Sequence, residues 1–123
     1  MLYAILCYDS EDVITAWTAE HEAKVMHDLQ AVQHKLAKQG RLGPVARLLP
    51  TTSATTIRKG KDAVVLDGPF AETKEQLLGF YVIDCEGLEQ ALETAKELAQ
   101  ASGSAGAFEL RPIMVLNPVT PTL

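Results

Sequence analysis

The 123-residue sequence has few of the residues and motifs that mark metal, nucleotide or thiol chemistry. Its two cysteines and three histidines never fall at metal-ligand spacing, and it contains no HExxH, CxxC, GxGxxG, P-loop or serine-elbow motif. These absences argue against zinc hydrolysis, redox thiols, nucleotide binding and serine hydrolysis. We therefore predict a protein that works without a metal or another cofactor.

Basic clusters and long apolar runs are also missing. The net charge is −5, and the densest group of basic residues is only Arg58-Lys59 and Lys61. We therefore expect no nucleic-acid partner. The apolar start Met1 to Cys7 is too short for a signal peptide, and no run approaches a membrane span. We predict a cytoplasmic protein with no membrane partner, in which Cys7 and Cys85 are buried thiols rather than a disulfide.

Apolar residues are plentiful enough for a core. At 47% hydrophobic, the chain fits one domain spanning 1–123, with a short C-terminal tail from about 116. Val25, Leu29, Val32 and Leu36 repeat at helical spacing, and Gly40 ends that pattern. The patterns predict helices at 16–39 and 88–99, and strands at 2–8, 45–49, 54–59, 63–66, 77–85 and 107–115.

This order of elements is that of a ferredoxin-like split βαβ domain with an inserted hairpin. We predict an α+β fold in which two helices cover one face of an antiparallel sheet. The first strand and the strand 77–85 are apolar on both faces, as Tyr3 and Tyr81 illustrate beside Phe80 and Val82. The face without helices therefore needs a cover, and a second copy of the chain is the simplest one, so we expect a homodimer.

One run resembles a known family signature. Residues 67–75, Asp-Gly-Pro-Phe-Ala-Glu-Thr-Lys-Glu, resemble the motif that names the DGPF branch of the YCII-related family. The resemblance extends from Met1-Leu2-Tyr3 to Glu109-Leu110-Arg111-Pro112. The resemblance implies a dimeric α+β barrel. It also implies the Asp/His acid–base pair that is proposed for that family. The position of the family's histidine falls around Leu29 here, so an inherited pair is not complete.

The motif itself supplies the first candidate site residues. Gly68 and Pro69 force the preceding strand to end, which leaves Asp67 either as a general base in a cleft or as a turn-capping carboxylate. Both readings stay open. Glu72, Thr73 and Lys74 are candidates for binding a polar substrate, and the alternative is a solvated turn.

The histidines differ in their placement on the first helix. His27 and His34 lie opposite the apolar stripe and should be exposed. His21 lies roughly 40° from the stripe, near the helix start, so it is the histidine we pair with Asp67 as a catalytic candidate. A packed residue is the commoner reading of such a position.

Two further residues complete the predicted site. Arg111 is a candidate for anchoring an anionic ligand, although an ion pair with Glu109 on the same strand face is the reading we favour. Arg47 is a weaker candidate of the same kind. Tyr81 places a phenol in a predicted cavity between the sheets of two copies, or else packs in the core.

We predict a cofactor-independent protein that binds a small polar or aromatic molecule and carries out proton transfer or elimination on it. One alternative is a non-catalytic ligand-binding or interaction module accessory to transcription regulation, which the family resemblance suggests. A cofactor-free monooxygenase is a third reading, based on fold analogy alone.

Overall fold

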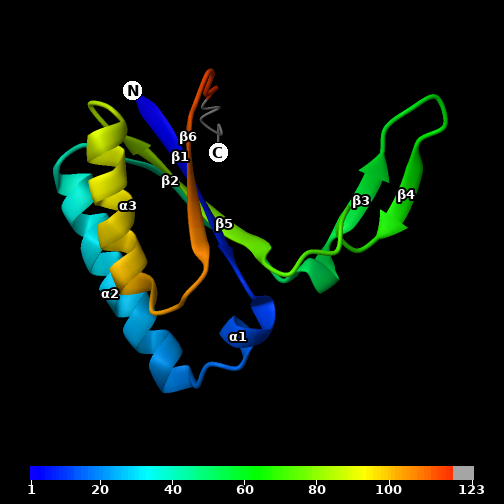
Figure 1. Ribbon diagram of the computed structural model, residues 1–123, viewed down its shortest axis with the longest axis horizontal. Helices are drawn as coiled ribbons and strands as arrows, with labels where there is room; N and C mark the ends of the chain where they lie inside the picture. The colour runs from blue at the N-terminus through cyan, green and yellow to red at the C-terminus, as the bar shows by residue number, and fades with distance from the viewer. Residues whose placement is uncertain (118–123) are drawn as a thin grey trace, which may run out of the picture.

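The computed structural model describes residues 1–117 and is built around an antiparallel four-stranded sheet with the order β2-β5-β1-β6 (Figure 1). Its strands are β1 (Leu2–Asp9), β2 (Leu42–Arg47), β5 (Gln76–Asp84) and β6 (Ala107–Pro112). Helices α2 (Ala19–Lys38) and α3 (Leu88–Ser102) lie side by side on one face. The predicted α+β ferredoxin-like fold is therefore confirmed.

Local signals place most element ends close to their predicted positions. Helix α2 starts after Thr18, whose hydroxyl accepts a hydrogen bond from the His21 backbone N–H at 3.1 Å. It ends before Gly40, which takes the left-handed φ of 69°. The short helix α1 (Glu11–Thr15) was not predicted, because five residues are too few to carry a periodic stripe.

Strand β2 lies a few residues earlier than predicted. Pairing with β5 places Leu42 opposite Ile83 and Val45 opposite Tyr81, and the register shifts between Leu42 and Val45. The chain then leaves the sheet and forms the 3-10 turn η1 (Thr51–Ser53) after Pro50. A tertiary pairing, rather than the local apolar run, therefore sets the bounds of this strand.

The core lies between the sheet and the two helices. Tyr3, Ile5, Tyr81 and Ile83 point from the central strands toward the helices and are all buried, together with Leu36, Ala95 and Leu98. Tyr81 therefore follows the core-packing reading rather than the reading that placed it between the sheets of two copies, and Tyr3 packs in the core beside it. The alternation of a strand sends their neighbours to the other side, and the helix-free face is formed by Leu2, Ala4, Leu6, Phe80 and Val82.

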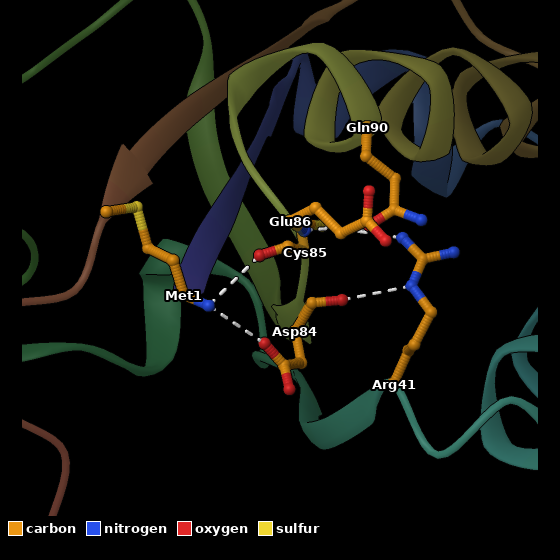
Figure 2. A network of polar contacts seen from close by, with 6 residues as sticks. All are labelled: Met1, Arg41, Asp84, Cys85, Glu86 and Gln90. Atoms are coloured by element: carbon orange, nitrogen blue, oxygen red, sulfur yellow. Dashed lines mark hydrogen bonds and ion pairs between the residues drawn. The ribbon is translucent and has the colours of Figure 1, made fainter.

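Polar contacts join the ends of several elements at one corner of the fold (Figure 2). The Met1 ammonium donates to the Asp84 carboxylate at 3.1 Å and to the Cys85 carbonyl at 3.0 Å. Arg41 donates from Nε to the Asp84 carbonyl at 3.0 Å and from Nη2 to the Thr94 hydroxyl at 2.7 Å. These bonds link the starts of β1 and β2, the end of β5 and helix α3.

A second sheet contains only β3 (Thr55–Arg58) and β4 (Val64–Asp67), paired antiparallel. This is the predicted inserted hairpin, and we call residues 55–67 the arm. The arm extends from the body on the side of the main sheet that carries no helices (Figure 1). The two strands pack chiefly against each other.

The last two features concern the C-terminal tail and the possibility of a membrane-spanning helix. The predicted tail from about 116 falls almost wholly outside the described residues. Among the helices within residues 1–117, none combines the length and apolar character needed to cross a bilayer.

Candidate functional site

A cavity of about 620 Å³ lies between helices α2 and α3 and the main sheet. The helices supply Val25, Leu29, Leu92 and Ala95 to its wall, and the sheet supplies Cys7, Val45, Tyr81 and Phe108. Ile14 of α1, Trp17 and the loop before β6 border it as well. Most of the lining is apolar, with a few polar side chains among it.

Asp9 is the buried carboxylate of this cavity. It ends β1, lines the cavity and is 7% exposed, and no other Asp or Glu within residues 1–117 is buried. Its Oδ1 accepts a hydrogen bond from the Ser10 backbone N–H at 2.7 Å, whereas Oδ2 has no partner within the described part of the chain. That oxygen therefore keeps its capacity to accept a hydrogen bond or a proton.

Gly106 makes room for this carboxylate. A Cβ at position 106 would stand 2.9 Å from the Asp9 Cγ and closer still to the Tyr8 carbonyl oxygen. A side chain larger than hydrogen would therefore displace the end of β1. The loop that precedes β6 thus holds Asp9 against the cavity by close backbone approach.

Tyr81 and Cys7 place two neutral polar groups on the sheet wall. Burial raises the pKa of the Cys7 thiol to about 12. Burial, followed by the neighbouring Cys7, raises the pKa of the Tyr81 phenol to about 12, and the Gln33 side chain acts in the opposite direction. Near neutral pH both groups keep their protons, so Tyr81 can donate a hydrogen bond and Cys7 is a poor nucleophile.

An ion pair spans α2 and β2 beside the cavity. Arg47 Nη2 donates to the Glu22 carboxylate at 3.1 Å, and Nη1 contacts the Met26 sulfur at 3.6 Å. All three residues border the cavity, and the Arg47 and Glu22 side chains are about half exposed. The pair therefore lies where the cavity meets solvent. Arg47, the weaker of the two predicted anion anchors, is thus paired with Glu22.

The residues of the 67–75 motif lie apart from the cavity. Asp67 ends β4 at the base of the arm, is exposed, and its carboxylate makes no hydrogen bond within residues 1–117. Glu72, Thr73 and Lys74 are exposed as well, and the Thr73 hydroxyl donates to the Glu75 carbonyl in a segment without helix. None of these four side chains lines the cavity.

His21 and Arg111 are on two other elements. His21 is half-buried on α2 and meets Trp17 edge-to-face, with ring centroids 4.8 Å apart. Trp17 borders the cavity, whereas His21 does not. Arg111 is exposed on β6 and pairs with Glu109, as the favoured reading predicted. The structure therefore does not bring Asp67, His21 and Arg111 together, and the predicted candidates that line the cavity are Tyr81 and the weaker candidate Arg47. His27 and His34 are exposed, as predicted.

Sequence reasoning missed Asp9 as a site residue. A charged residue at the end of an otherwise apolar strand was read only as the signal that closes the strand. Asp9 lies close to Gly106, which is distant in sequence.

Residues 1–117 contain no group of three or more His, Cys, Asp or Glu side chains arranged to hold a metal ion.

The family model of the YCII-related domain matches residues 1–117. An uncharacterized protein of Rhizobium meliloti (strain 1021) is 55% identical over 119 residues, which cover 96% of each chain.

Proposed function

Because this chain belongs to the YCII-related family, and because the family assignment names no reaction, we propose its function from the cavity. The proposal is that the protein binds a small, largely apolar molecule between its helices and its sheet, without a cofactor. The cavity with Asp9 in its wall is the observation that supports this proposal. Cytoplasmic location and membership in the DGPF branch remain part of the proposal.

The size and lining of the cavity suit a small organic molecule. Ligand sites commonly have volumes of about 300–1,000 Å³, with mostly apolar walls and a small number of convergent polar groups. At about 620 Å³ this cavity falls within that range. Trp17, Tyr81 and Phe108 present aromatic surface to it, which favours a ligand with an aromatic or flat apolar part.

The polar groups suggest what the ligand carries and what chemistry it can undergo. The Asp9 Oδ2 accepts a hydrogen bond, and the neutral Tyr81 phenol donates one, so a ligand with one donor and one acceptor is complementary to both. If the protein is an enzyme, proton transfer or elimination remains the proposed reaction, with Asp9 as the proton acceptor. The catalytic roles predicted for Asp67 and His21 would then require these two side chains to act from outside the cavity.

Binding of an apolar fluorescent probe tests the proposal. We expect anilinonaphthalene sulfonate to brighten with the wild-type protein and to be displaced by small aromatic compounds. Ala99→Trp should reduce probe binding by about 10-fold or more, because Ala99 lines the cavity and a larger side chain occupies ligand space. Ala31→Trp on α2 is the matched control, because Ala31 is exposed and does not line the cavity.

Two amide variants then separate the two carboxylates. Compounds that displace the probe should be compared by thermal shift on Asp9→Asn and Asp67→Asn, since a ligand stabilises the folded protein by mass action. We expect Asp9→Asn to alter the shift and Asp67→Asn to leave it unchanged. Equal probe binding by Ala99→Trp and Ala31→Trp would exclude the cavity as the site and favour the non-catalytic interaction module.

A further inference from the structure

Asp9 extends from the face of the main sheet that carries the helices. It lies two residues after Cys7 on β1, and residues two apart share one face of a strand. Cys7 packs against the core and lines the cavity, as its β6 neighbour Phe108 does. The register shift beside Cys7 lies on β5, because β1 pairs regularly with β6 through Tyr8. The Asp9 side chain therefore projects from the same face as Cys7.

The Asp9 carboxylate has no positively charged partner within residues 1–117. It takes part in none of the ion pairs of this part of the chain, although it is only 7% exposed. Oδ1 accepts from the Ser10 backbone N–H, which leaves Oδ2 without a partner. No unpartnered polar side-chain atom of the described chain is sealed off, so Oδ2 is within reach of water or a ligand. A buried carboxylate without a cation is costly, and such a group calls for an ion, a water or a ligand.

The other charges of the cavity do not supply that cation. Arg47 is held by Glu22 at the mouth, at 3.1 Å. Lys96 lines the cavity from α3, but it is exposed and forms no ion pair within residues 1–117. Charges interact more strongly where water is excluded, so the buried Asp9 outweighs the exposed Lys96 in setting the sign of charge that the cavity favours. That sign is positive.

An organic ammonium group suits this place better than a metal ion does. A metal ion takes several protein ligands, and the described chain holds no group of three or more His, Cys, Asp or Glu side chains around one point. An ammonium group needs only hydrogen-bond acceptors, and the Ser104 hydroxyl lines the cavity as a further one. Trp17 and Phe108 add aromatic rings to the wall, and the negative faces of such rings attract cations. The lining therefore combines a carboxylate with aromatic surface.

We propose that the ligand of the cavity is an amine that carries an aromatic ring, and that its ammonium group pairs with Asp9. This inference rests on the proposed function, because it takes the same cavity as the binding site, and it adds the chemical class of the ligand. Folding has already removed the carboxylate from water, so the ammonium group gains a charge-assisted hydrogen bond there without further desolvation of Asp9. The aromatic ring lies in the apolar part of the cavity, and a ligand carboxylate in place of the ammonium is repelled.

Calorimetric titration with matched compounds tests the pairing. Tryptamine, tryptophol and indole acetate share an indole ring and differ in their end group, which is an ammonium, a hydroxyl or a carboxylate. Phenethylamine, phenethyl alcohol and phenylacetate repeat the comparison on a smaller ring. We expect the amines to bind the wild-type protein about 10-fold more tightly than the alcohols, because a charge-assisted hydrogen bond is stronger than a neutral one. The acids should bind more weakly than the alcohols.

Two variants locate the charge that is responsible. Asp9→Asn should remove the preference for amines and leave the alcohols bound, because the amide keeps the Oδ1 acceptor for the Ser10 N–H but has no charge. Glu93→Gln on α3 is the matched control and should keep the preference. It also removes one negative charge, but Glu93 is exposed and does not line the cavity.

Other outcomes would overturn the proposal. Equal binding of amines and alcohols would do so and would leave the cavity standing as a binding site. A preference for amines that survives in Asp9→Asn, or that Glu93→Gln also removes, would exclude Asp9 as the partner of the ammonium group. If none of these compounds binds, the amine assignment fails, and the probe experiment with Ala99→Trp shows separately whether the cavity binds an apolar molecule.

A measurement on the wild-type protein decides if Asp9→Asn fails to fold. In protein with isotope-labelled aspartate carboxyl carbons, tryptamine should shift the NMR resonance of one buried aspartate more than tryptophol does. Equal shifts with the two compounds would contradict the pairing.

Discussion

Tyr81 and Cys7 should make the fold less stable as the pH becomes alkaline. Burial raises the pKa of Cys7 from 9.0 to about 12, and burial together with Cys7 raises that of Tyr81 from 10.0 to about 12. As the pH rises, the unfolded chain loses these protons before the folded chain does. The stability that the two groups contribute is therefore complete below about pH 9 and is lost progressively as the pH approaches about 12.

We predict that Tyr81→Phe makes the protein less sensitive to alkali. Between about pH 8 and about pH 11, the wild-type free energy of unfolding should fall more steeply than that of the variant, because phenylalanine has no proton to lose. Urea unfolding across this range measures both slopes. Identical slopes would show that the Tyr81 phenol ionises equally well in the folded and unfolded states.

At the scale of elements, Arg41 joins pieces of the fold that are distant in sequence. Arg41 immediately precedes β2, and its guanidinium donates to the carbonyl of Asp84 at the end of β5 and to the hydroxyl of Thr94 on α3. Thr94 is buried at 4% exposure. Removing the arginine therefore takes a charged donor away from the Asp84 carbonyl and from the Thr94 hydroxyl, which keeps only its bond to the Gln90 carbonyl.

We predict that Arg41→Met lowers the free energy of unfolding by about 1.5–3 kcal/mol, the usual net contribution of a hydrogen bond to a charged group. Lys24→Met is the control, since its ion pair with Asp28 is exposed on a single helix and such pairs contribute about 0.5 kcal/mol or less. Thermal and urea unfolding compare the two variants. Equal losses would mean that Arg41 acts only as a surface ion.

At the scale of the whole molecule, stability should come from packing and hydrogen bonds alone. Leu36, Ile83 and Leu98 are almost fully buried between the helices and the sheet, and the cysteines and histidines never fall at ligand spacing in the sequence. We predict that dialysed protein retains no stoichiometric transition metal and that its Tm is unchanged by a chelator. Elemental analysis and thermal unfolding with and without chelator check this, and a chelator-dependent fall in Tm would contradict it.

The sequence by itself determined the types of the main elements and their order. Helix α2 follows from the spacing of Val25, Leu29, Val32 and Leu36 and from the stop at Gly40, because helical periodicity and a glycine cap are local properties. The hairpin follows from two β-rich runs joined at Gly60. The pairing of Arg111 with Glu109 also follows locally, since residues two apart share one strand face.

Tertiary structure alone decided which surfaces these elements cover. Both faces of β1 and β5 are apolar, so no alternation in the sequence could tell that Tyr3 and Tyr81 lie under the helices while Leu6 and Phe80 lie on the open face. Glu11 accepts hydrogen bonds from the distant Thr51, and Asp67 lies outside the cavity. The burial of Asp9 against the loop at Gly106 could not be predicted either, because long-range packing, rather than residue type, sets the burial of a charged side chain.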